Sequence, residues 1–422
     1  MASTGSNSSN NGADRATGRA DIVVGLTSYN DGETIGAVMR AASAGLAPAF
    51  GRSATRFLLA DAGSTDGTRQ IAREVGGAAL IELEYERGPA FTGPPYHGEP
   101  GRVAALRAIL ETAQRLDAKA CAVIGAGIQS AQPDRFEQFI APVLADGFDY
   151  VSPYYVRHAN EGALTKAIVS PMFRALYGVR LRQPAASGFG CSKRLAAHYL
   201  EQDLWEIEQA RTGIDLRLAV AAVCGDFRTC EAVFGPRSGP TRGVPADLST
   251  TLAQVVGALF ADLEHRVDVW QRVRASSAIP VFGTPTPLDT EPPPLDVDAL
   301  VESFRLGYRE LREIWTWVLP PRTLVELRRL TEVTPARLRF DGRMWAGIVY
   351  DFAVGYAFRV MPHDHLLRSL TPLYSGWLAS FVVEARGQSA EQIDERLEQL
   401  CLAFEGEKRH LISRWRWPEP LR

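Results

Sequence analysis

The chain has 422 residues, of which 46% are hydrophobic and 23% charged, and its formal net charge is −3. This length exceeds one ordinary domain and predicts one large α/β domain plus a smaller one. Nucleic acids are bound by concentrated basic surfaces, so the near-neutral charge argues against nucleic acid as a main partner.

The cysteines and the N-terminal residues indicate the cellular compartment of the protein. The five cysteines are scattered and form no CxxC pair, so neither a disulfide framework nor a zinc ribbon is indicated and a reducing cytoplasm is expected. No apolar run approaches the ~18–20 residues of a membrane span. Residues 1–20 lack the apolar segment of a secretory signal, and their Ser, Asn and Gly content predicts a disordered tail.

The first ordered residues alternate short β-branched runs with helical periodicity. Residues 22–26 predict a buried strand that ends in the polar loop 27–32, and residues 33–47 have helical spacing. A second strand at 56–60 ends in the loop 61–68, after which a helix capped by Ser64 or Asp66 is expected. The order β-α-β-α predicts a mostly parallel sheet with crossover helices.

The later elements continue this alternation and then give way to helices. Further strands are expected at 79–83, 120–124 and, at a sheet edge, 150–155, and helices at 103–116, 136–145, 164–176, 214–223 and 248–273. Residues 276–299 are rich in proline and predict a linker. Beyond them, apolar residues three or four apart predict an all-α extension. The expected division is therefore a tail (1–20), an α/β domain (21–275), a linker (276–299) and a helical domain (300–422).

Two loops are placed where a ligand would bind. Open parallel sheets bind ligands at the carboxyl ends of their strands, and the loops 27–31 and 61–67 follow the first two strands. The Asp61 carboxylate could bond a ribose or a base edge, and the glycines of the second loop allow close backbone approach. Spacing alone leaves ligand binding and helix capping as alternatives.

These loops belong to a wider resemblance. The segments DIVVGLTSYND (21–31) and ADAGSTDGT (60–68) resemble the opening of the GT-A glycosyltransferases. Later segments resemble one branch of them, the retaining glucosylglycerate, mannosylglycerate and glucosyl-3-phosphoglycerate synthases. These segments are YHGEPGR (96–102), RALYGVRLRQP (174–184), TGID (212–215) and LTPLY (370–374). The resemblance implies a GT-A fold, a UDP- or GDP-hexose donor and a small, glycerate-like acceptor.

The resemblance also assigns residues. Arg102 stands where the branch has a lysine that reaches the diphosphate, and with Asp215 it is the expected catalytic pair. Acceptor contacts fall on Arg182, Ser187, Gly188 and Asp215, and capping of a helix N-terminus is the alternative for Asp215. The donor is expected to contact Thr27, Ser28, Tyr29, Asn30, Asp31, Asp61, Gly63, Ser64, Gly125, Ala126, Gly127 and Arg237.

The pattern departs from the family at its metal site. GT-A enzymes carry an acidic DxD-type motif that holds Mg²⁺ or Mn²⁺, whereas this chain has GAGIQS at 125–130, and PRSG at 236–239 lacks the usual histidine. No bound metal is therefore expected. In one interpretation Arg102 and Arg237 replace the ion in a metal-independent, retaining transfer. The alternatives are a catalytically degenerate sugar-nucleotide-binding protein and a metal site that has moved.

The remaining expectations concern partners. Helical extensions in this branch imply a homodimer, and the absence of an apolar span predicts no membrane insertion. The histidines of the His363–His365 segment follow a proline and are expected to begin a helix rather than to bind a metal.

Overall fold

The computed structural model describes residues 18–51, 53–86, 99–128, 131–158, 161–205, 213–236, 248–286 and 294–417. Their contacts divide the chain into two compact units. The first, here called the sheet unit, comprises residues 1–156, 186–245 and 279–287, and the second, the helical unit, comprises residues 157–185, 246–278 and 288–422.

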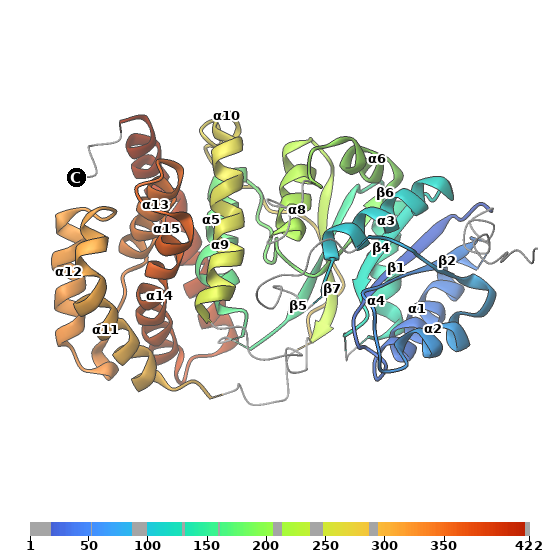
Figure 1. The fold of residues 1–422 in the computed structure, drawn as a ribbon, viewed down its shortest axis with the longest axis horizontal. Coiled ribbons are helices and arrows are strands. Elements are labelled where there is room, and N and C mark those ends of the chain that lie inside the picture. Colours follow the sequence, from blue (N-terminus) through green and yellow to red (C-terminus); the bar gives the residue numbers. More distant parts are fainter. Residues whose placement is uncertain are drawn as a thin grey trace, which may run out of the picture. The chain divides into compact units, whose positions relative to one another are not determined.

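An eight-stranded sheet, ordered β3-β2-β1-β4-β6-β5-β7-β8, forms the centre of the sheet unit (Figure 1). The strands are β1 Ile22–Ser28, β2 Thr55–Asp61, β3 Leu80–Glu82, β4 Ala120–Gly125, β5 Tyr150–Val156, β6 Gly188–Ser192, β7 Thr229–Pro236 and β8 Val281–Phe282. Strands β3, β2, β1 and β4 run parallel to one another. Strand β6 is antiparallel to its two neighbours, β4 and β5, and β5, β7 and β8 are parallel to one another. The predicted α/β class with a mostly parallel sheet is confirmed.

Helices cover both faces of this sheet, which is why all seven residues of β1 are buried. The helices are α1 Ile35–Phe50, α2 Thr68–Gly76, the short η2 Gly77–Ala79, α3 Arg102–Arg115, α4 Pro133–Leu144, α6 Lys193–Glu201 and α8 Ile214–Cys224. Val24 and Leu26 share one apolar core with α1 and α4. Gly25 faces the other way, where an added Cβ would stand 2.4 Å from Ile109 Cγ2 of α3. The alternation along the strand thus assigns each side chain to one helical layer.

The helical unit contains the all-α region that the periodicity predicts. Its elements are η3 Thr165–Val169, α5 Ser170–Tyr177, α9 Leu248–His265, α10 Val267–Trp270, α11 Val297–Thr316, α12 Pro321–Glu332, η4 Pro335–Arg337, α13 Gly342–Ala357, α14 His363–Ala385 and α15 Ala390–Arg416. Trp315 and Trp345 are fully buried, and Trp345 Nε1 donates to the Ala167 carbonyl over 2.9 Å. Within the described residues, no helix combines the length and the apolarity that a membrane crossing requires.

Several details differ from the sequence expectations. Strands β6, β7 and β8 were not expected, and β8 lies inside the segment predicted as a linker. Strand β5 is an inner strand rather than an edge strand, because the antiparallel β6 lies on one side of it and β7 on the other. The single helix expected at 248–273 is broken at Arg266, whose φ of −121° and ψ of 33° are not helical. Residues 157–185 and 246–278 group with the C-terminal helices rather than with the sheet. The reason is packing: Arg174 of α5, for example, pairs with Glu398 and Glu405 of α15.

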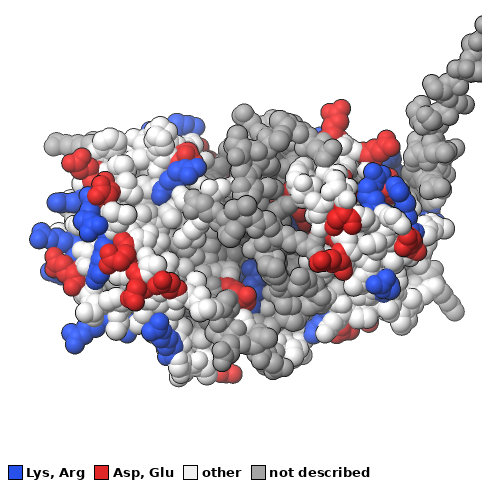
Figure 2. Space-filling view, turned by 60° about the horizontal axis from the view of Figure 1, so that its bottom comes forward, with Lys and Arg blue, Asp and Glu red and all other residues white. Residues whose placement is uncertain are grey.

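Acidic and basic side chains are interspersed over the described parts of the face shown in Figure 2. This mixture agrees with the near-neutral charge of the chain. A single-signed surface of the kind that attracts polyanions is not seen in the described residues of that face.

Candidate active site

The two loops singled out in the sequence form one surface at the carboxyl edge of the sheet. Ser28 and Asp61 are register partners of β1 and β2, and Ser28 Oγ donates to Asp61 Oδ1 over 2.8 Å. Asn30 N donates to Ser64 Oγ over 2.8 Å, and Thr65 N donates to Asn30 Oδ1 over 2.9 Å. These reciprocal bonds join segments 34 residues apart in the chain.

Asp61 organises its own turn. Its Oδ2 accepts hydrogen bonds from Gly63 N at 3.0 Å and Ser64 N at 2.9 Å, and its Oδ1 accepts from the Ser28 and Ser64 hydroxyls. Gly63 has a φ of 94°, a left-handed conformation that favours glycine. A carboxylate offers about four acceptor positions, so a ribose hydroxyl would reach Asp61 by replacing one of the serine hydroxyls.

The residues of the loop 27–31, which follows β1, differ in how far they are buried. Thr27, Ser28 and Asp31 are buried, whereas the Tyr29 side chain is 39% exposed. Asp31 Oδ2 accepts from Tyr29 N at 3.0 Å, and Asp31 N donates to Thr68 Oγ1 at 2.9 Å, so Asp31 holds the loop backbone. Asn30 has a φ of 54°, which asparagine tolerates better than most residues. Tyr29 therefore carries the most exposed side chain of this loop.

Arg102 and Asp215 come together from positions 113 residues apart. Arg102 is the first residue of α3 and Asp215 the second of α8. Arg102 Nε donates to Asp215 Oδ2 over 2.8 Å and Nη2 donates to Oδ1 over 2.7 Å, which is the bidentate geometry that fits guanidinium to carboxylate. Their side chains are only 8% and 6% exposed. Asp215 therefore engages the arginine from the first turn of its helix.

The third guanidinium nitrogen of Arg102, Nη1, has two further partners. Arg102 Nη1 donates to Thr27 Oγ1 over 3.1 Å and to Glu99 Oε2 in a short ion pair. Burial lowers the pKa of Arg102, but the facing carboxylates of Asp215 and Glu99 outweigh it and raise the pKa above its ordinary value. The resemblance places Arg102 at the position of a lysine that reaches the diphosphate, and in the structure its donors bind Asp215, Thr27 and Glu99. The sequence analysis did not single out Glu99; its signal is the (i, i+3) spacing to Arg102 across a helix start.

Carboxylates from other loops lie against the glycines that end β4. A Cβ at Gly125 would stand 2.8 Å from Glu99 Oε1, and a Cβ at Gly127 would stand 2.9 Å from Asp31 Oδ1. Between them, Ala126 N donates to the Thr27 carbonyl over 2.8 Å. A side chain at either position would contact an acidic group of a neighbouring loop.

The residues here do not compose the metal site that the resemblance implies. Gly125, Ala126 and Gly127 offer no side-chain ligand, and the described residues include no group of three or more His, Cys, Asp or Glu side chains placed to hold a metal ion. Glu99 is paired with Arg102, and Asp31 accepts a backbone N–H.

The expected acceptor residues divide between the two units. Ser187 and Gly188 lie at the start of β6, where Gly188 pairs with Ile124 of β4. The Ser187 carbonyl accepts a bond from Tyr155 Oη over 3.2 Å. Arg182 is exposed and belongs to the helical unit. Arg237, the second expected cation, lies outside the described residues.

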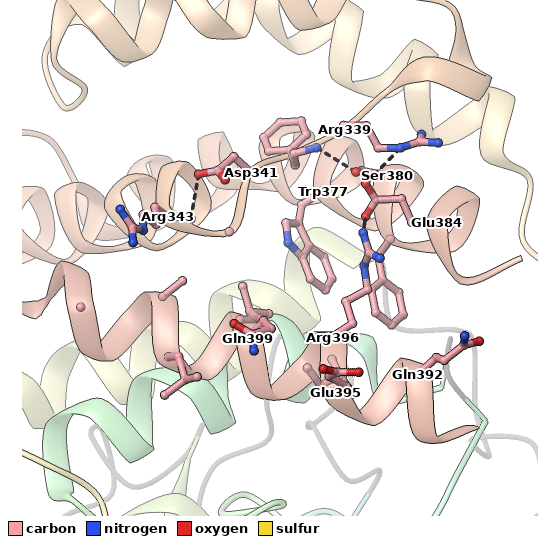
Figure 3. A pocket seen from close by; sticks show the side chains of 18 of the residues that line it. Arg339, Asp341, Arg343, Trp377, Ser380, Glu384, Gln392, Glu395, Arg396 and Gln399 are labelled. Carbon is pink, nitrogen blue, oxygen red and sulfur yellow. Dashed lines mark hydrogen bonds and ion pairs between the residues drawn. The ribbon is translucent and has the colours of Figure 1, made fainter. Parts of the chain in front are cut away.

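The helical unit has a groove of about 1120 Å³ between the start of α13, the end of α14 and α15 (Figure 3). Trp377 and Phe381 stack in its wall with centroids 5.3 Å apart. Glu384 pairs with both Arg339 and Arg396, as the dashed lines in Figure 3 show. Glu384 is thus occupied by two guanidinium groups, and the groove presents no reactive constellation like that around Arg102.

Among known proteins, the chain is similar only to proteins found by comparing solved structures. No family model matches the chain, and the curated proteins contain no match. One similar structure is mannosyl-3-phosphoglycerate synthase from Rubrobacter xylanophilus, with 19% identity over 60% of this chain and 77% of that chain and a TM-score of 0.42. Another is glucosyl-3-phosphoglycerate synthase from Mycobacterium tuberculosis in complex with Mn²⁺, UDP and glucosyl-3-phosphoglycerate, with 19% identity over 60% and 81% and a TM-score of 0.38.

Proposed function

We propose that this chain is a glycosyltransferase that moves a hexose from a UDP- or GDP-sugar to a small polar, glycerate-like acceptor. The observation that carries this proposal is the bidentate Arg102–Asp215 pair at the carboxyl edge of the sheet, beside the joined loops. A buried ion pair adds little net stability over apolar packing. Its position where α/β sheets bind ligands favours a role in binding and chemistry.

Different residues are proposed to bind the base, the ribose and the diphosphate of the donor. Tyr29, exposed at the loop tip, stacks on the base, and the loop around Asp61 and Ser64 receives the ribose. Arg102, oriented by Asp215, supplies the positive charge that stabilises the departing diphosphate. Such preorganised charge can replace a metal ion electrostatically, so the transfer is proposed to be metal-independent.

The acceptor end is proposed to involve the start of β6, at Ser187 and Gly188. Retention of configuration, which the resemblance implies, follows a front-face route that needs no dedicated general base. Arg182 remains an acceptor contact predicted from the sequence. We also propose a homodimer in a reducing cytoplasm; all five cysteines are free thiols.

A catalytically silent sugar-nucleotide-binding protein is the second candidate. The observation that favours it is that Arg102 is already held by Asp215, Glu99 and Thr27. The carboxylates that would hold a metal at 125 and 127 are also missing.

Calorimetric titration with UDP-glucose and GDP-mannose, each with and without Mg²⁺ or Mn²⁺, tests the proposal. We expect one donor to bind equally well with and without metal, and to release its nucleoside diphosphate when glycerate or phosphoglycerate is added. Binding without turnover would support the silent protein. Binding only with metal would contradict the metal-independent site, and failure of both donors to bind would overturn the proposed function.

A further inference from the structure

The partners of Arg102 differ in how firmly they are placed. Asp215 takes two parallel bonds on Nε and Nη2 and is anchored in the first turn of α8. Glu99 contacts only Nη1, which it shares with Thr27, and it precedes α3 rather than lying within a helix. Bidentate pairing fixes both position and orientation, whereas a single contact fixes neither. The Glu99 end of the guanidinium is therefore the exchangeable one.

Glu99 also occupies a particular place. One of its carboxylate oxygens meets Arg102 Nη1, and the other lies 2.8 Å from where a Cβ of Gly125 would be. Gly125 ends β4, and Thr27, which shares the same Nη1, is near the end of β1. An anionic ligand group entering at the carboxyl edge of these strands would reach Arg102 at this position.

We propose that Glu99 is a built-in competitor for the anionic group of the ligand, so that a diphosphate binds by displacing Glu99 from Arg102 while Asp215 keeps the guanidinium in place. This inference rests on the proposed function of the same site. Glu99, Asp215 and Arg102 together carry a net charge of about −1, so the exchange replaces one anion by another and never leaves Arg102 unpaired. Only a ligand with a strong anionic group can make this exchange, which selects nucleoside diphosphates over nucleosides.

A substitution at Gly125 provides a second, independent way to weaken the contact between Glu99 and Arg102. A methyl group there would stand 2.8 Å from Glu99 Oε1, the far end of a flexible side chain, and its next neighbour would be Thr27 Oγ1 at 3.9 Å. G125A is therefore expected to move the Glu99 carboxylate away from Arg102 without removing any charge. The variant E99Q keeps the shape of the side chain and removes its charge.

The test is the calorimetric affinity of the full-length protein and its variants for inorganic pyrophosphate, UDP and uridine. We expect E99Q and G125A each to lower the dissociation constants of pyrophosphate and UDP by about tenfold, and to leave uridine unchanged. The matched control is E111Q, which removes a carboxylate from the exposed face of α3.

The results distinguish the competition by Glu99 from the proposed glycosyltransferase function. Unchanged or weaker pyrophosphate binding in both E99Q and G125A would overturn the competition. If both variants bind pyrophosphate more tightly but no variant binds UDP-glucose or GDP-mannose, the competition stands and the proposed function fails. If the sugar nucleotides bind wild type and both variants equally, the proposed function stands and Glu99 is not a competitor. If no variant binds pyrophosphate or sugar nucleotide, both ideas fail.

Discussion

Asp215 and Arg102 form a bidentate ion pair across 113 residues of sequence, with both side chains withdrawn from solvent. The pair joins the first turn of α8 to the first turn of α3 at the edge where the strands end. Its removal should therefore affect both the stability of the sheet unit and the recognition of an anionic ligand.

For D215N we expect the protein to lose about 3 kcal/mol of unfolding free energy, because breaking a buried pair leaves a charge without its main partner. The binding of UDP should weaken as well, since the guanidinium loses its orientation. Urea denaturation and calorimetry measure the two effects. D203N, at an exposed position on the same unit, is the control. Unchanged stability would mean that Glu99 and Thr27 alone suffice to hold Arg102.

Y29A should weaken the binding of UDP or GDP by about tenfold, because stacking of an aromatic ring on a base contributes roughly 1–3 kcal/mol. Its melting temperature should stay at the wild-type value, since the side chain is 39% exposed. Y29F keeps the ring and should bind like wild type. Pyrophosphate affinity should be the same in all three proteins, and a loss there would show that Tyr29 acts on the phosphates instead.

G45A should destabilise the fold severely. Gly45 lies inside α1, and a Cβ there would be 1.8 Å from the Pro133 carbonyl oxygen, a backbone atom that moves only if α4 shifts. We expect a loss of at least about 3 kcal/mol, the upper range for overpacking. G347A in α13 meets no atom within 4 Å and should be neutral or stabilising by up to about 1 kcal/mol. Thermal unfolding of both variants checks the contrast, and equal melting temperatures would contradict it.

Lys408 makes the stability depend on pH. Its Nζ donates to the Ala175 and Val273 carbonyls over 2.6 and 2.9 Å, and burial, reinforced by Arg274, lowers its pKa to about 8. Between pH 8 and the ordinary lysine pKa near 10.5, the unfolded chain binds more protons at this position than the folded one. Its contribution to stability therefore rises with pH across that window.

Denaturant unfolding at pH 7, 8, 9 and 10 should show wild type gaining about 2–3 kcal/mol relative to K408M over this range. The difference between wild type and K119M, at an exposed lysine, should stay nearly constant. A wild-type advantage over K408M that falls as the pH rises would show that Lys408 stays charged in the folded protein.

Local patterns predicted much of this fold. The strands at 22–26, 56–60 and 120–124 were recognisable because buried parallel strands are continuous apolar runs. The helices of the C-terminal region were recognisable from their 3.6-residue periodicity. The position of β5 was not, because nothing in its own sequence records that the antiparallel β6 inserts between it and β4.

The site shows the same division. The sequence by itself determined the two loops after β1 and β2 and the absence of acids at 125 and 127, and the resemblance pointed to Arg102 and Asp215. Only the tertiary structure decided that these two residues pair and that Glu99 shares the guanidinium. The physical reason is that a charge buried in a low-dielectric site takes whichever opposite charge the topology brings within reach. Asp215 is brought to Arg102 by the packing of α3 and α8 on the sheet, and a separation of 113 residues leaves no trace in sequence spacing.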